Sequence, residues 1–282
     1  MIKKLNPMIA ALALLALAAR ADDLAQKGRD IFKAGQHAVV TVQVVLKYSG
    51  GARSSNPTEA KTDATGTVVD PSGLTVLALS SVDPAELYRR LSDEYKVETE
   101  VNDVKILLDD GTEMPAEIVL RDKDLDLAFV RPKAKPATPM VAVDLSKSSA
   151  VEMLEPLVVL NRLNRAAGRA YSASIERIAA VIQKPRTFYI PESSGSAISL
   201  GSPAFALDGN IVGLFVMRAV SAPDTNARNM RDNMTVILIP AEDILKGARQ
   251  APEAKGETEK PPDKSAEKPA DKKDQKDTKE QK

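Results

Sequence analysis

Short runs of aliphatic and β-branched residues, separated by tight-turn signals, constrain the fold of this chain more than any other feature of its sequence. The clearest signal is Asp-Pro-Ser-Gly at 70–73, between the runs TGTVVD and LTVLAL. Asp first, Pro second and Gly fourth is the pattern that a type I turn favours. Asp-Gly pairs at 110–111 and 208–209, each between further runs of this kind, predict two hairpins. Many short strands joined by Gly and Pro turns predict a β-sandwich or a β-barrel.

Other segments predict individual strands, loops and helices. Residues rich in β-branched side chains predict strands over Ala38–Tyr48 and Thr235–Pro240, and the small polar residues of Ser49–Asp63 predict a loop. Three helices are also expected: an amphipathic one over about 22–37 with Leu24, Ile31 and Phe32 apolar, one that begins with Asp83 as cap and Pro84 as first residue and runs through ELYRRLSDEY, and one over AEDILKGARQ.

The composition limits both the core and the chemistry. Hydrophobic residues make up 43% of the 282 residues but aromatic ones only 4%, with no Trp, so the core must be built from Val, Ile, Leu and Ala. The formal net charge of zero removes the electrostatic argument for a nucleic-acid partner. The absence of Cys excludes a disulfide framework, a Cys-ligated zinc and a thiol nucleophile, and His37 is the only His.

The first 21 residues have the layout of a secretory signal peptide. Lys3 and Lys4 precede an apolar run over Met8–Ala19, and Ala19-Arg20-Ala21 is a small-x-small cleavage pattern. The alternative, a membrane anchor, is disfavoured because a run of about 12 residues is too short to span a bilayer, which takes roughly 20. We therefore expect cleavage after Ala21, no membrane span after signal removal, and an exported protein that is periplasmic or extracellular.

The C-terminal segment, 250–282, has a different composition from the rest of the chain. It contains almost nothing that could be buried, so we expect it to be disordered. Acidic and basic residues are roughly equal in number, which makes it a neutral polyampholyte and not a basic arm. It is either a solvated tail or a spacer that contacts the cell envelope.

Several motifs, in order along the chain, resemble the HtrA type of trypsin-like serine peptidases. The stretch ATGTVVDPSGLTVLALSSVD is similar to the first hairpin of that family, and DKDLDLAFVR to the segment that carries its catalytic acid. SLGSPAFALDGNIVGLFV and NMTVILIPAEDIL resemble its nucleophile loop and its closing strand and helix. The resemblance covers about Val39–Leu245. It implies an all-β domain at 38–249 with two six-stranded antiparallel β-barrels, within about 39–131 and 140–245, after an N-terminal helix.

The chain departs from that family at the residues that perform the chemistry. A catalytic triad needs a base, an acid that orients the base, and a nucleophile beside an oxyanion hole. By the resemblance these positions fall on Ser80, Asp126 and Leu200, so only the acid is retained. Ile198 stands for the Gly before the nucleophile, and Gly201-Ser202-Pro203 for Gly-Gly-Pro, which should deform the oxyanion hole. We therefore expect no catalytic residues.

Other catalytic constellations are less favoured by the sequence. His37 precedes the first strand and lacks the context of a catalytic base, although a role from outside the barrel stays open. A Ser–Lys mechanism needs a desolvated lysine, and no spacing singles out Lys184 with Ser80, Ser199 or Ser202.

A metal site and a phosphate loop are also disfavoured. Asp122, Asp124 and Asp126 alternate, but the sixth position of a calcium loop is Leu127 instead of Gly. We expect no metal and no cofactor.

The leading functional hypothesis is a non-catalytic pseudo-peptidase domain that binds a protein or peptide ligand in the envelope. Two alternatives remain: an active HtrA-like serine endopeptidase with atypical catalytic residues, and a structural envelope protein whose tail makes the contacts. After Leu245 the sequence passes to the polar tail, so we expect no PDZ-like module of the kind that HtrA proteins normally carry.

Overall fold

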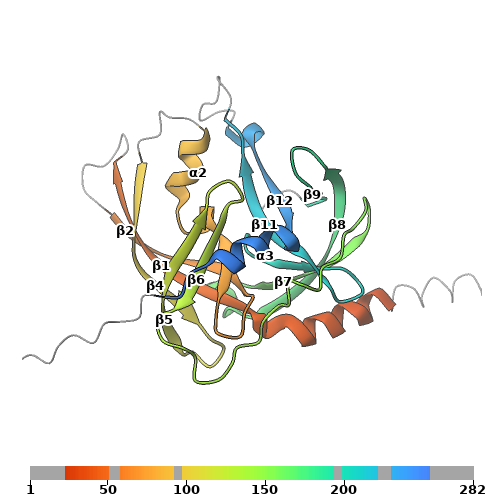
Figure 1. Ribbon diagram of the computed structural model, residues 1–282, viewed down its shortest axis with the longest axis horizontal. Coiled ribbons are helices and arrows are strands. Elements are labelled where there is room, and N and C mark those ends of the chain that lie inside the picture. The colour runs from red at the N-terminus through yellow and green to blue at the C-terminus, as the bar shows by residue number, and fades with distance from the viewer. Residues whose placement is uncertain (1–22, 51–57, 92–96, 194–198, 222–229, 255–282) are drawn as a thin grey trace, which may run out of the picture.

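The computed structural model describes residues 23–50, 58–91, 97–193, 199–221 and 230–254. The expected signal peptide, most of the charged tail and Ile198 lie outside these residues. Two β-barrels lie side by side in the described chain, the first at the left of Figure 1 and the second at the right. No helix in the described ranges is long and apolar enough to cross a membrane.

The first barrel closes six antiparallel strands from the N-terminal half of the chain. Its order around the barrel is β1 (Val39–Gly50), β2 (Thr58–Val68), β3 (Thr75–Ala78), β6 (Leu127–Pro132), β5 (Glu113–Asp122) and β4 (Val97–Leu107), which pairs with β1 again.

The second barrel repeats this plan with the C-terminal half. Its order is β10 (Pro203–Phe205), β11 (Ile211–Ala219), β12 (Met234–Pro240), β9 (Phe188–Pro191), β8 (Tyr171–Ile182) and β7 (Pro156–Arg162), which pairs with β10. The expected fold of two six-stranded antiparallel barrels is therefore confirmed.

The predicted turns lie where their residues indicated. The N–H of Gly73 donates to the C=O of Asp70 at 2.9 Å and closes the Asp-Pro-Ser-Gly turn between β2 and β3. Gly111 and Gly209 have left-handed φ angles of +85° and +86° in the β4–β5 and β10–β11 hairpins. Glycine is favoured there because it lacks the Cβ that makes this conformation costly.

The predicted loop over Ser49–Asp63 is wrong at both ends, and residues 51–57 between them lie outside the described residues. Ser49 and Gly50 still belong to β1. Residues from Thr58 onward belong to β2 and pair with the far end of β1, for example Val45 with Lys61. The prediction failed because this part of β2 is half exposed, so its residues are polar like those of a loop. Pairing with β1 supplies the backbone hydrogen bonds that a polar strand needs.

Short helices flank the barrels. The N-terminal helix over 23–35 runs along the second barrel (Figure 1), and its apolar Ile31 and Phe32 pack against the buried cluster between the barrels. The N–H of Glu86 donates to the side chain of Asp83 at 3.4 Å, which confirms the predicted cap of α2. Besides the N-terminal helix, the described residues form η1 (Gln36–Ala38), η2 (Leu79–Ser81), α2 (Pro84–Leu91), η3 (Arg165–Ala167), η4 (Met230–Asn233) and α3 (Ala241–Gln250).

The core consists of three clusters: one inside each barrel and one between them. Most of its side chains are aliphatic, as the composition predicted, and Phe129 and Phe215 are the only aromatic members among the largest fully buried side chains. The cluster between the barrels joins strands of both barrels with α3. This shared core brings one end of β6 next to β11, and the candidate site is built there.

Candidate functional site

Ser80 and Asp126, two of the positions that the resemblance assigns to catalysis, are in direct contact. Ala78 at the end of β3 pairs with Leu127 at the start of β6, so the residues just outside these strands meet at one end of the first barrel. The carboxylate of Asp126 accepts hydrogen bonds from the N–H and the hydroxyl of Ser80, both at 2.8 Å. Asp126 is 2% exposed and Ser80 9%, so the pair is shielded from solvent.

The same carboxylate reaches the second barrel. Oδ2 of Asp126 accepts a hydrogen bond from the backbone N–H of Met217 in β11 at 2.9 Å. In a catalytic triad such a carboxylate orients an imidazole that takes the proton of the nucleophile. Here its partners include a hydroxyl, which does not act as a base at neutral pH, and two backbone N–H groups. Asp126 therefore joins the two barrels at this point.

Leu200, the third position, lies in a tight loop that leads into β10. The N–H of Gly201 donates to the C=O of Phe215 at 2.7 Å, and its C=O accepts from the hydroxyl of Thr67 at 2.8 Å. Gly201 has a φ of +89°, and a Cβ at this position would lie 2.1 Å from the C=O oxygen of Thr65. Leu200 is half-buried and packs against apolar clusters, so an alkyl side chain stands where the resemblance places a nucleophile.

Asn161 in β7 holds this loop in place, and the sequence analysis did not identify it. Its side-chain amide donates to the hydroxyl of Ser199 at 2.9 Å. Its Oδ1 accepts from the hydroxyls of Ser202 and Thr65, both at 3.2 Å. The hydroxyls of Ser199 and Ser202 are thus hydrogen-bonded to an amide, which cannot act as a general base. No sequence pattern marks Asn161, because its three partners come from distant segments.

The residues considered for a Ser–Lys mechanism do not come together. Lys184 is exposed in the turn between β8 and β9. No hydrogen bond joins it to Ser80, Ser199 or Ser202 in the described part of the chain.

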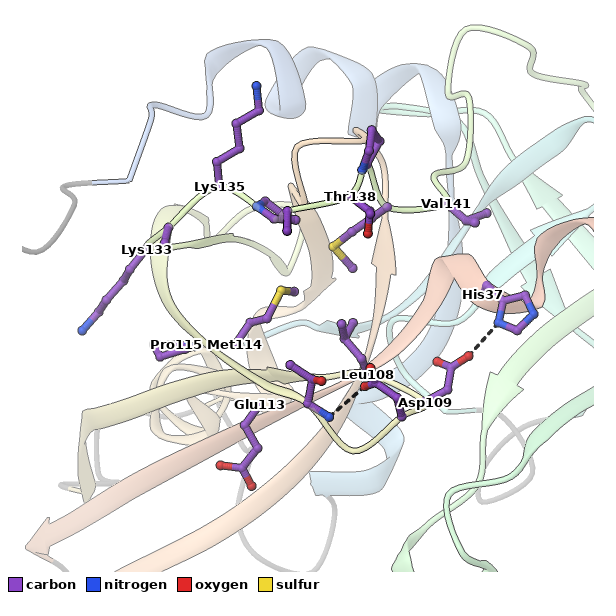
Figure 2. Close-up of a pocket in the computed structure, with 17 residues that line it drawn as sticks. His37, Leu108, Asp109, Glu113, Met114, Pro115, Lys133, Lys135, Thr138 and Val141 are labelled. Atoms are coloured by element: carbon purple, nitrogen blue, oxygen red, sulfur yellow. Dashed lines mark hydrogen bonds and ion pairs between the residues drawn. The ribbon is translucent and has the colours of Figure 1, made fainter.

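His37 lies away from these residues, on a groove of about 740 Å³ between the β4–β5 hairpin and the segment that links the barrels. Figure 2 shows its ring at one end of that groove, with Nδ1 2.8 Å from Oδ2 of Asp109. The ring also contacts Tyr171 edge-on, with 5.2 Å between centroids. Its partners are thus a carboxylate and a phenol, and none of the three serines.

Asp122, the first carboxylate of the alternating acidic run, has a structural role. Oδ1 of Asp122 accepts the N–H of Leu125 at 3.0 Å and closes the turn before β6. Across the described residues, no group of three or more His, Asp or Glu side chains is placed to hold a metal ion.

Beside the Ser80–Asp126 pair, one edge of β11 has no partner strand among the described residues, and we call it the open edge. Phe215 uses its N–H and C=O for the loop at 201–202, whereas the N–H of Val220 donates to the C=O of Asn233, the residue just before β12. Because backbone groups of a strand alternate in direction, Met217 and Ala219 point away from β12, as Phe215 does. β10 pairs with β11 only as far as Leu214. Beyond Phe215, no described strand pairs with this edge.

Comparisons with known proteins agree with this architecture. The sequence model of the trypsin-like peptidase domain family matches residues 64–214. No curated protein sequence matches the chain.

Among the solved structures that are similar to this chain are those of three proteases or protease domains. An HtrA-type protease, AlgW in a serine-to-alanine variant with a decapeptide, is 12% identical with a TM-score of 0.55, over 79% of this chain and 66% of that one. The Rv3671c protease from M. tuberculosis, in its active form, is 17% identical with a TM-score of 0.52, over 80% and 86%. The MamO protease domain from Magnetospirillum magneticum, in its apo form, is 17% identical with a TM-score of 0.48, over 77% and 98%. The first two show that the fold is shared.

Proposed function

Because the chain belongs to the trypsin-like peptidase domain family, we propose that it is an exported pseudo-peptidase, which binds extended peptide segments of envelope proteins and does not cleave them. The observation that carries the proposal is the contact between Ser80 and Asp126. A hydroxyl occupies the place beside the carboxylate where a base would be needed, and Leu200 offers no nucleophile. Export is inferred from the leader pattern over 1–21.

The open edge of β11 supports the binding part of the proposal. An extended peptide can add a strand to such an edge, with main-chain hydrogen bonds that supply affinity and alternate side chains that supply specificity. The C=O of Met217 and both backbone groups of Ala219 face that edge. The hydrogen bond from Met217 to Asp126 fixes the edge relative to the first barrel, so a ligand meets a preorganised strand.

The absence of catalysis is tested on the mature chain, 22–282. We expect no cleavage of unfolded casein and no labelling by a fluorophosphonate serine probe, with trypsin as the positive control. An active endopeptidase with atypical residues would instead cleave casein. Cleavage that is lost in Ser199→Ala or Ser202→Ala would overturn the pseudo-peptidase proposal.

Peptide binding is tested by fluorescence polarisation with labelled, casein-derived peptides and the variant Ala219→Pro. Proline removes the N–H that faces the open edge, and proline is tolerated at strand edges. One net hydrogen bond contributes about 1 kcal/mol, so we expect the Kd to rise roughly fivefold. Ala219→Val keeps the N–H and should bind like the unaltered chain. Equal affinities of all three proteins would exclude this edge as the binding site.

The assignment of the former triad can be tested by restoring it. We expect the double variant Ser80→His, Leu200→Ser to be labelled by the fluorophosphonate, because the imidazole would then lie against the carboxylate of Asp126. General-base assistance contributes about 10²–10⁴-fold, so even partial alignment should be measurable. Each single variant, and the double variant with Asp126→Asn added, should stay unlabelled. A folded double variant without labelling would contradict the assignment.

A further inference from the structure

A pocket of about 280 Å³ borders the open edge of β11 and is lined by two arginines and one aspartate. We call it the basic pocket. The side chains that give it its character are Asp124 from the first barrel and Arg186, Phe188 and Arg218 from the second. The segment from Met217 to Ser221 forms one of its walls, so a ligand on the edge of β11 would pass directly over it.

The two arginines of the basic pocket lack carboxylate partners. Arg218 lies over the ring of Phe188, with 5.0 Å between its guanidinium carbon and the ring centroid. No ion pair or hydrogen bond of either arginine side chain is present among the described residues. Elsewhere in the described chain, Arg162 and Arg169 both bind aspartates. A guanidinium presents five donors in a fixed fork that matches a carboxylate, so these two groups are suited to bind an anion.

The orientation of β11 directs ligand side chains toward this pocket. Successive side chains of a strand alternate between the faces of a sheet, so every second residue of a paired ligand projects to the same face. Arg218 projects to the same face of the sheet as Ile237 and Ile239 of β12 and lies over Phe188 of β9, and these residues line the basic pocket. An extended peptide on this edge therefore places alternate side chains beside the basic pocket, which Arg186 and Arg218 line.

We propose that the basic pocket gives the cleft a preference for acidic peptides, by accepting an Asp or Glu side chain between Arg186 and Arg218. This inference rests on the proposed function, since it names the ligand class of the same cleft. Asp124 is the only acidic side chain of the lining, so the pocket keeps a net positive charge. Asp124 comes from the opposite barrel and repels an anion on its own side, which directs the acidic group toward the two arginines.

The test uses the mature chain and a positional library of acetylated, amidated hexapeptides, with Glu, Gln or Lys fixed at one position at a time. We expect one position at which Glu binds at least about tenfold more tightly than Gln, because a charged hydrogen-bonded pair contributes more than a neutral one. The preference should shrink at high salt, since the pocket is open to solvent. The variant Asp124→Asn should strengthen it.

Charge reversal identifies the residues responsible. Arg186→Glu should abolish the preference for peptides with Glu and create a preference for peptides with Lys. Arg218→Gln should weaken the preference for Glu, and it does so without introducing a negative charge. Arg121→Glu is the matched control, because it makes the same change of charge at an exposed position of β5 outside the pocket. It should leave the preference unchanged.

The outcomes separate this inference from the proposed function. Peptides that bind the β11 edge equally well with Glu, Gln or Lys at every position would overturn the inference and leave the function standing. A preference for Glu that persists in both arginine variants would also overturn the assignment to this pocket. No binding by any library peptide would overturn both.

Discussion

Among the described residues, three that are not glycine have left-handed backbones, and each needs a physical reason. Asp126, at φ +58°, is held by its buried hydrogen bonds to Ser80 and Met217. Arg169, at +53°, donates from Nε and Nη2 to the same oxygen, Oδ2 of Asp63, at 2.9 and 2.7 Å. Leu154, at +70°, has a side chain that is 65% exposed, so little burial compensates for its strain.

Replacing Leu154 by glycine should stabilise the protein. A left-handed backbone costs a residue with a Cβ roughly 1–2 kcal/mol, whereas glycine adopts it freely at some cost in unfolded-state entropy. We expect Leu154→Gly to raise the free energy of unfolding by about 1 kcal/mol, measured by urea denaturation. Met153→Gly is the control, because Met153 is 60% exposed and has no left-handed φ, so it should be neutral or destabilising. A destabilised Leu154→Gly variant would contradict the strain argument.

At the scale of elements, the loop before β10 is the most tightly placed part of the cleft. It is fixed by backbone bonds to β11, by the hydroxyl of Thr67, and by the amide of Asn161. Gly201 allows this placement, because its Cα lies against the backbone of the first barrel at Thr65. The loop therefore docks both barrels on one another as well as lining the cleft.

Gly201→Ala should disrupt this docking far more than the same change elsewhere. Gly209 has almost the same φ, +86°, but no atom lies within 4 Å of an added Cβ. Gly209→Ala should cost about 1 kcal/mol through backbone strain alone. For Gly201→Ala we expect at least about 3 kcal/mol in urea denaturation, together with weaker peptide binding, because the Cβ would overlap the backbone of Thr65. Equal losses for the two variants would show that packing at Gly201 is unimportant.

At the scale of the whole molecule, polar contacts supplement the apolar cluster that joins the barrels. Arg169 of the second barrel binds Asp63 of the first. In the same way Arg162 and Tyr171 bind Asp109, at 3.4 and 2.5 Å. Partial burial alone would raise the pKa of Asp63, but hydrogen bonds from Gln43 and Arg169 and the charges of Arg169 and Arg165 outweigh it, so the pKa lies below its ordinary value.

The depressed pKa of Asp63 predicts how stability changes with pH. Its contribution is complete above the unfolded value of about 3.9 and is lost as the pH falls through the folded value. We expect Asp63→Asn to lower the free energy of unfolding by about 2 kcal/mol above pH 5, and by progressively less below pH 4. Urea denaturation from pH 3 to 7 measures this difference.

Asp243→Asn is the control, because Asp243 pairs with Lys246 within α3 and does not join the barrels. Its effect on stability should be small across the whole range. A deficit of Asp63→Asn that does not change with pH would show that the ion pair with Arg169 is not its cause.

Most turns, strands and helices were predictable from local patterns in the sequence, and so was the departure from the residues that the resemblance assigns to a triad. Tight turns at 70–73, 110–111 and 208–209 depend on local backbone preferences, so they could be read directly from their residues. The single His and the absence of Cys are likewise facts of composition. The resemblance supplied the two-barrel arrangement and the positions Ser80, Asp126 and Leu200.

The contacts that these positions make depend on the tertiary structure. The hydrogen bond from Met217 to Asp126, the contacts of Asn161 with three hydroxyls, and the approach of Arg186 and Arg218 to one pocket all join residues that are distant along the chain. Local sequence patterns carry no information on such pairs, because barrel closure and the docking of the two barrels determine which side chains meet. The polar strand from Thr58 was missed for the same reason, since it forms only against β1.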